Sequence, residues 1–228
     1  MLNVYSIEMN FRTNIPSSAS VAAPSGNNRL SAPAAEKNAG PITDLVKEFA
    51  PDRGQALEIA SGTGQHIVKL AVVKPNLNWQ PSDIDPIRIA SIETWCKDYN
   101  LANVRPPIIL NATEIGWSSK FTGQKFIFLV NLFHLISEDE ATILISEISA
   151  ALALGGRSII YGPFKRNNKL TSAGDHTFHH SLIEADPQIG YKNDAWMTAK
   201  FKEKKLGLLK VVPMPANNLA FICEKLRM

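Results

Sequence analysis

The sequence predicts an α/β fold in which helices cover both faces of a mostly parallel sheet. Three observations predict it. Short apolar segments alternate with segments of helical spacing through most of the chain, a pattern typical of parallel sheets with crossover helices. A turn containing two glycines joins the first of these strands to a helix. Two strand-like runs close the chain without a helical segment between them, as a hairpin at the sheet edge would.

The expected elements follow in order. The apolar strand-like segments are 56–59, 77–83, 104–110, 126–130, 157–161, 208–212 and 219–223. The segments of helical spacing are 41–49, 67–71, 86–99 and 137–153, with one or two further helices after Lys165. Asp85 and Pro86 form a helix start, and Ser137 with Glu140 forms a capping box. Gly155 and Gly156 are expected to end the helix before them.

The composition is that of an ordinary soluble enzyme, with 228 residues, 45% hydrophobic and 20% charged. A net charge of +3 is too small, and the basic residues too scattered, to indicate nucleic-acid binding. Cys96 and Cys223 lie far apart, which suits free thiols in a reducing compartment. No apolar run approaches the ~20 residues that cross a bilayer. We therefore expect a cytoplasmic protein without a membrane partner.

Residues 1–28 are rich in Ser, Ala, Asn and Pro. They lack the basic start and apolar core of a secretory signal. We expect residues 1–28 to be a disordered extension and residues 29–228 to form a single domain. A transit peptide and a start codon assigned too early are the alternatives.

The turn after the first strand is the most informative feature. Gly62 and Gly64 would let the backbone approach a ligand without interference from a Cβ, and the next helix offers unpaired N–H groups. Glu58 lies in the strand end, where its negative charge would repel a pyrophosphate but suits a cationic ligand without phosphate. The turn therefore points to S-adenosylmethionine rather than NAD.

Ligands of such sheets bind outside the carboxyl ends of the strands. The residues expected to bind the cofactor there are Glu58, Ala60, Ser61, Gly62, Thr63, Gly64, Asp83, Asn111, Ala112 and Asn131. Asp83, at the end of the second strand, is expected to accept hydrogen bonds from the ribose hydroxyls, with a helix cap as the alternative. Asn111 is expected to accept from the adenine amine, with a plain turn residue as the alternative. Asn131 is expected to face the sulfur atom of the methyl donor.

Two residues at strand ends are candidates for taking a proton from the methyl acceptor, namely His134 and Tyr161. Packing in the core is the alternative for both. His176, His179 and His180 would share one side of a helix. No matching pattern of metal ligands accompanies them, so we expect no metal site and retain a substrate-facing polar cluster as the alternative.

Taken together, these segments resemble the methyltransferase-like 26 family from about Leu30 to the C-terminus. The motifs that carry the resemblance are 31–38, 57–66, 79–83, 131–134, 161–164 and 214–218. The resemblance implies a three-layer, Rossmann-like class I methyltransferase fold, whose sheet has seven strands with the last antiparallel. It also implies S-adenosylmethionine bound by the loop 58–64 and by Asp83. This chain departs from the family pattern at Asn111, where aspartate is usual, and at 175–179 and 192–193, in the presumed substrate region.

We therefore expect an S-adenosylmethionine-dependent methyltransferase with a small-molecule acceptor. Residues 31–38 are interpreted either as a lid over its site or as the start of a surface helix. The departures in the substrate region motivate an alternative, a catalytically inactive protein that binds S-adenosylmethionine. A nicotinamide-dependent oxidoreductase is disfavoured by Glu58 and by the lack of GxGxxG spacing.

Overall fold

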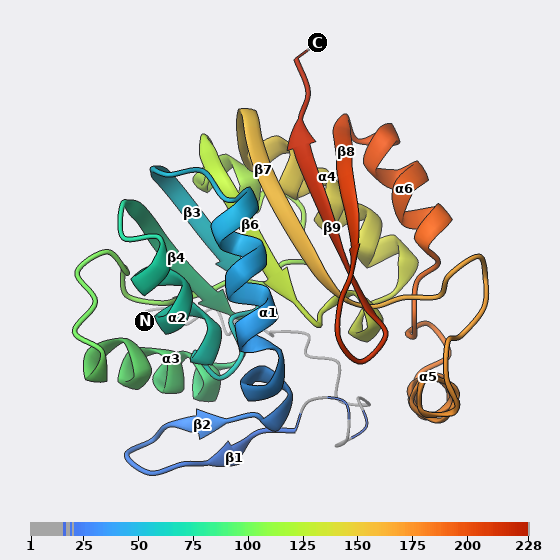
Figure 1. Ribbon diagram of the computed structural model, residues 1–228, viewed down its shortest axis with the longest axis horizontal. Helices are drawn as coiled ribbons and strands as arrows, with labels where there is room; N and C mark the ends of the chain where they lie inside the picture. Colours follow the sequence, from blue (N-terminus) through green and yellow to red (C-terminus); the bar gives the residue numbers. More distant parts are fainter. Residues whose placement is uncertain (1–15, 17–18, 20, 228) are drawn as a thin grey trace, which may run out of the picture.

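The computed structural model describes residues 16, 19 and 21–227. Its centre is a seven-stranded sheet with helices on both faces (Figure 1). The strands, in spatial order, are β5 (Ile108–Ile109), β4 (Leu77–Asp83), β3 (Gly54–Ile59), β6 (Gln124–Val130), β7 (Leu152–Pro163), β9 (Asn218–Lys225) and β8 (Leu206–Pro213). The first five pair in parallel, and β9 is antiparallel to both β7 and β8. The predicted sheet, mostly parallel with the last strand antiparallel, is confirmed.

Six α-helices are found in the described part of the chain. They are α1 (Pro33–Phe49), α2 (Gln65–Val73), α3 (Pro86–Asp98), α4 (Glu138–Ala151), α5 (Ala173–Ala185) and α6 (Asp194–Glu203). Short 3₁₀ segments at Trp117–Lys120 and Phe133–Leu135 complete the helical part. None of these helices combines the length and the hydropathy needed to cross a bilayer.

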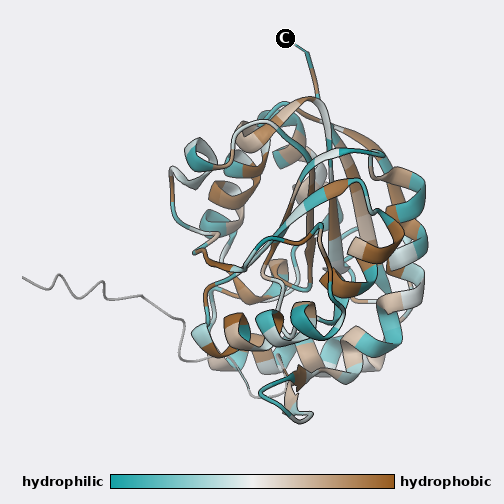
Figure 2. Ribbon diagram, turned by 90° about the vertical axis from the view of Figure 1, so that its left-hand side faces the viewer, coloured by the Kyte–Doolittle hydropathy of each residue, from teal (hydrophilic) through white to brown (hydrophobic). Residues whose placement is uncertain are grey.

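Two hydrophobic clusters lie on opposite faces of the sheet. In β6, Phe126 and Phe128 pack with α1, α2 and α3, whereas Ile127 and Leu129 pack with α4 and α6. Because successive side chains of a strand point to opposite faces, a strand covered on both sides must be apolar throughout. Figure 2 shows the helices carrying hydrophilic and hydrophobic residues side by side, as expected of elements with one face on a sheet.

Three predicted element boundaries were wrong. Helix α1 begins at Pro33, two turns before the predicted start, because proline fits the first turn and Ala35 and Ala39 add buried contacts. Strand β5 keeps only two residues, because Pro106 and Pro107 have no N–H to donate to a ladder.

The third boundary is the end of α4. The helix stops at Ala151, and β7 starts at once, so Gly155 and Gly156 lie inside the strand rather than at a helix end. A Cβ at Gly156 would lie 2.7 Å from the carbonyl oxygen of Gln124 in β6. Close approach of two strands therefore accounts for this glycine.

Residues 1–15, 17–18 and 20 of the predicted N-terminal extension lie outside the described residues. Further along, β1 (Ala23–Pro24) and β2 (Leu30–Ser31) form a small antiparallel pair. The segment after it is tied to the domain by Gln65, whose Oε1 accepts from Ala32 N at 2.7 Å and whose Nε2 donates to Ser31 Oγ at 3.2 Å. These bonds hold the start of α1 over the end of the sheet.

Candidate functional site

A cavity of about 800 Å³ opens at the carboxyl ends of β3, β4, β6 and β7, which meet at one edge of the sheet (Figure 1). This volume lies in the range of small-molecule sites. The residues predicted to form the site line the cavity with one exception; those that do are Glu58, Ala60, Ser61, Gly62, Thr63, Asp83, Asn111, Ala112, Asn131, His134 and Tyr161. The segment predicted as a lid also contributes, through Ala32, Pro33, Ala34, Ala35, Lys37 and Asn38.

The turn after β3 is held by the end of β4. The backbone N–H of Gly62 donates to Asp83 Oδ2 at 2.9 Å, and Asp85 N donates to Asp83 Oδ1 at 3.0 Å. Ser61 N donates to Ser82 O at 2.8 Å. Asp83 is 4% exposed, and its helix-cap alternative is not what the structure shows, because Asp85 caps α3 by accepting from Ile87 N. Asp83 thus orients the turn and presents its carboxylate to the cavity.

Gly64 is the exception among the predicted site residues. A Cβ at Gly64 (φ 93°) would lie 2.9 Å from Ile92 Cα and 3.2 Å from Trp95 Cδ1. The glycine is therefore needed for close packing of the turn against α3. Gly62 lines the cavity and Gly64 does not, so contact of the Gly64 backbone with a ligand stays a prediction.

Glu58 is a buried carboxyl that lacks a complete set of partners. It is 2% exposed, and its Oε2 has no hydrogen-bond partner. Burial raises the pKa of the Glu58 carboxyl to about 8, and the nearby Asp83 carboxylate adds to the rise. Without a ligand this carboxyl is therefore mostly protonated at neutral pH, contrary to the expectation of a standing negative charge. A buried acid with an open oxygen suits a cationic ligand, which would favour the ionised form.

Asn111 lines the cavity, but its acceptor is already in use. Its Oδ1 accepts from Thr113 N at 3.1 Å and from Thr113 Oγ1 at 2.8 Å, and its Nδ2 donates to Glu114. Both lone pairs of Oδ1 are therefore occupied. The alternative interpretation of Asn111 as a turn residue fits these bonds better than an adenine contact.

Tyr161 is the centre of a buried polar network that sequence reasoning missed. Its hydroxyl accepts from Asn218 Nδ2 at 3.0 Å and is also hydrogen-bonded by the Asn38 side chain. Asn38 Oδ1 in turn lies 2.8 Å from His66 Nε2, which leaves Nδ2 of Asn38 as the group that reaches Tyr161. The three partners all belong to motifs noted in the sequence, but nothing in the sequence showed that they meet.

These hydrogen bonds determine the direction in which the Tyr161 hydroxyl can donate its proton. Because the oxygen accepts from two amides, its own O–H is left to donate into the cavity that Tyr161 lines. Burial raises the pKa of this phenol, so it keeps its proton at neutral pH. Tyr161 is thus arranged as a hydrogen-bond donor, not as a base.

His134 is buried against aromatic rings that the sequence did not single out. The centroid of its ring lies 5.5 Å from that of Phe178 and 6.3 Å from that of Tyr191. Both aromatic residues line the cavity. Its Nδ1 has no hydrogen-bond partner. Burial, with the nearby Lys192 ammonium, lowers the pKa of His134 to about 3. The imidazole is therefore neutral and can accept a hydrogen bond, but it is a weak base.

The three histidines of α5 lie outside this cavity, on a separate pocket with Lys165 and Lys169. Among the described residues, no group of three His, Cys, Asp or Glu side chains is placed to hold a metal ion. Within the departures noted at 175–179, Asp175 accepts from Tyr191 Oη at 3.2 Å and from Asn217 Nδ2 at 2.9 Å. Asp175 therefore supports a cavity wall rather than facing solvent.

Solved structures with this fold include several O-methyltransferases. An O-methyltransferase family protein from Burkholderia thailandensis matches with a TM-score of 0.70 and 16% identity, over 82% of this chain and 56% of that one. An O-methyltransferase family 2 protein from Planctomyces limnophilus, in complex with apigenin, matches with a TM-score of 0.71 and 14% identity. The match covers 85% of this chain and 58% of that one.

The O-methyltransferase NcsB1 from neocarzinostatin biosynthesis, in complex with S-adenosylmethionine and 2-hydroxy-5-methyl naphthoic acid, matches with a TM-score of 0.68 and 12% identity, over 85% of this chain and 55% of that one. This chain thus spans little more than half the length of these enzymes. At such identities the likeness shows the fold, which is the Rossmann-like fold of class I methyltransferases.

One sequence family also matches, over residues 29–225, and its description is "Protein of unknown function (DUF938)". Because this match covers most of the chain, the protein belongs to the DUF938 family.

Proposed function

We propose that this protein is an S-adenosylmethionine-dependent methyltransferase that acts on a small molecule. The observation that carries the proposal is the buried Glu58 carboxyl, whose Oε2 lacks a partner beside the turn that Asp83 orients. The methyltransferase fold and the cavity of about 800 Å³ support it. Membership of the narrower methyltransferase-like 26 family and a cytoplasmic location stay predictions.

The residues around the turn would hold the cofactor. Asp83 has carboxylate oxygens for the two ribose hydroxyls, and Glu58 offers an anionic partner to the cationic end. Ala112 and Asn131 also line the cavity. S-adenosylmethionine, when bound, supplies an electrophilic methyl group on a sulfonium. The buried, low-polarity surroundings of Glu58 would strengthen its attraction for a cation.

The chain's own contribution to transfer is mainly the positioning of the acceptor. Tyr161 donates a hydrogen bond and so holds an oxygen of the acceptor. His134, kept neutral, accepts a hydrogen bond from the acceptor's hydroxyl or amine. Phe178 and Tyr191 provide flat apolar walls. Since His134 is a weak base, an acceptor that is already nucleophilic fits the site best.

The compounds held by two of the similar structures, apigenin and a naphthoic acid, support an acceptor of small aromatic type here. A protein that binds the cofactor without transferring a methyl group is the second candidate, and the low pKa of His134 is the observation that favours it.

Calorimetric titration of the full chain with S-adenosylmethionine, S-adenosylhomocysteine and NAD tests the proposal. We expect binding of both adenosyl ligands and none of NAD. Release of S-adenosylhomocysteine is then followed with a panel of small phenols and carboxylic acids. Failure of both adenosyl ligands to bind refutes the proposal, and NAD binding would restore the oxidoreductase alternative. Binding without turnover on any compound selects the non-catalytic candidate.

A further inference from the structure

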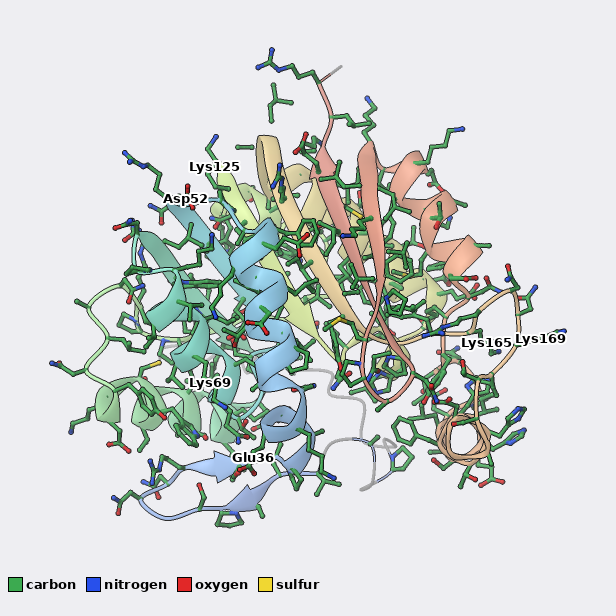
Figure 3. All side chains as sticks on the ribbon, viewed as in Figure 1. Glu36, Asp52, Lys69, Lys125, Lys165 and Lys169 are labelled. Carbon is green, nitrogen blue, oxygen red and sulfur yellow. The ribbon has the colours of Figure 1, made fainter. Side chains whose placement is uncertain are left out.

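A second pocket, of about 510 Å³, lies between the segment after β7 and helix α5. The residues that line it are Lys165, Asn168, Lys169, Leu170, His176, His179 and His180. None of them is acidic, and none also lines the large cavity. Figure 3 shows Lys165 and Lys169 on the loop between β7 and α5, away from the other labelled lysines.

Lys165 and Lys169 have no acidic partner among the described residues. In the part of the chain that the structure describes, the side chains of Lys165 and Lys169 take part in no ion pair and no hydrogen bond. Lysines elsewhere on the surface do find acidic partners, as Lys47 does in Asp44 and Lys204 in Glu203. Two unpaired ammonium groups at one concave site create a positive potential that favours an anion.

His179 adds a fixed hydrogen-bond donor to this pocket. Its Nδ1 accepts from the backbone N–H of Tyr191 at 3.1 Å. The proton of the neutral ring must therefore lie on Nε2. Burial and the surrounding cations, Lys165 first among them, lower the pKa of His179 to about 4, so the ring stays neutral with Nε2–H as donor.

The backbone is shaped to hold this ring. Gly190 has φ 129°, and a Cβ there would lie 2.8 Å from Cε1 and 2.9 Å from Nδ1 of His179. A side chain at this position would displace the imidazole. The His179 ring is thus held in place from the Gly190–Tyr191 backbone, unlike a histidine that merely lies on a helix surface.

We propose that this pocket binds a small, multiply charged anion of the phosphate class. Lysine ammonium groups bind phosphate oxygens as point charges, and the imidazole N–H adds a directed bond. A metal ion does not suit the site, because the two lysines would repel it and, among the described residues, no three His, Cys, Asp or Glu side chains are placed to hold one. The proposal is independent of the methyltransferase activity, because the two pockets share no lining residue.

Pyrophosphate is the probe for the test, with inorganic phosphate and acetate as comparison anions. The full chain is titrated with each at constant ionic strength by calorimetry, while the imidazole resonances are followed by NMR. We expect one pyrophosphate per chain, shifts centred on His176, His179 and His180, and weaker binding of acetate. Acetate binding as tightly as pyrophosphate, or shifts at His66 and His134 instead, would overturn the proposal.

The matched variants remove two charges each. Lys165→Gln with Lys169→Gln should weaken pyrophosphate binding at least about tenfold, since two charge-assisted contacts are lost. Lys69→Gln with Lys125→Gln, two exposed lysines elsewhere on the molecule (Figure 3), should leave it unchanged. Equal weakening in both double variants would show attraction to net charge only and would refute a site. The NMR shifts of the unmodified protein decide the matter should a variant fail to fold.

Discussion

The backbone N–H of Gly62 donates a hydrogen bond of 2.9 Å to Asp83 Oδ2, across 21 positions of sequence. This bond joins the turn after β3 to the end of β4. A carboxylate that both orients the turn and lines the cavity explains why an acid, rather than an amide, suits this strand end. It also makes substitution of Asp83 the most direct test of the proposed cofactor site.

Asp83→Ala is expected to weaken S-adenosylhomocysteine binding by at least about 100-fold. Each hydrogen bond to a charged group contributes about 1.5–3 kcal/mol, and both ribose hydroxyls as well as the Gly62 contact would lose their acceptor. Calorimetry measures the loss. Asp52 lies in an exposed loop at the other end of the sheet. The control variant Asp52→Ala should therefore bind S-adenosylhomocysteine with the affinity of the unmodified protein. Equal affinity in the Asp83 variant would refute the ribose assignment.

Glu58 should make the stability of the protein fall with rising pH. Its pKa rises from 4.5 to about 8 on folding, so between these values the folded protein holds a proton that the unfolded chain has released. The stabilising effect of that proton is full below pH 4.5 and is lost as the pH rises through 8.

The comparison with Glu58→Gln isolates this effect. Three histidines have a lowered pKa, namely His66, His134 and His179. They make the free energy of unfolding rise with pH, but they do so in both proteins, so their effect cancels in the comparison. The stability of the glutamate form relative to the glutamine form should fall by about 1.4 kcal/mol per pH unit, or roughly 3 kcal/mol from pH 5.5 to 7.5. Denaturant titrations at several pH values measure it. If the free energies of unfolding of the two proteins changed in parallel with pH, Glu58 would be ionised in the folded protein.

Tyr161→Phe should destabilise the fold although it keeps the aromatic ring. The change leaves the amide donors of Asn38 and Asn218 facing an oxygen that is gone. A buried polar group without a partner costs about 1–3 kcal/mol. Tyr99→Phe, at an exposed position (46%), should change the free energy of unfolding by less than about 0.5 kcal/mol. If the two variants are equally stable, the polar network is not formed in solution.

Ala60→Gly should stabilise the protein. Ala60 has φ 52° in the turn after β3, a left-handed conformation that costs a residue with a Cβ about 1–2 kcal/mol. Glycine lowers the free energy of unfolding by about 0.4–1 kcal/mol, because it gives the unfolded chain more entropy. The relief of strain is larger, so we expect a net stabilisation of roughly 0.5–1 kcal/mol. Ala90→Gly, at an exposed position inside α3, should instead cost about 1 kcal/mol. Destabilisation of similar size at both positions would contradict the strain argument.

Local patterns were enough to predict the order of the strands and helices and the end of the sheet at which the large cavity opens. Hydrophobic periodicity reports which residues must leave water, and in a parallel sheet the ends of consecutive strands converge on one edge. The residues predicted between Glu58 and Tyr161 line the cavity there, with the exception of Gly64, and their roles toward a ligand stay predictions. The boundaries of α1, α4 and β5 were missed because they depend on packing and ladder partners, which local periodicity does not contain.

The sequence by itself determined a glycine turn behind an acid and a second acid at the next strand end. Only the tertiary structure decided what those groups are chemically. Complete burial makes Glu58 a proton-bearing carboxyl at neutral pH. Two amides, brought from Asn38 and Asn218 to Tyr161, turn a possible base into a donor. The physical reason is the same for both: desolvation and hydrogen-bond geometry set the protonation of a side chain, and both arise from residues far apart in the chain.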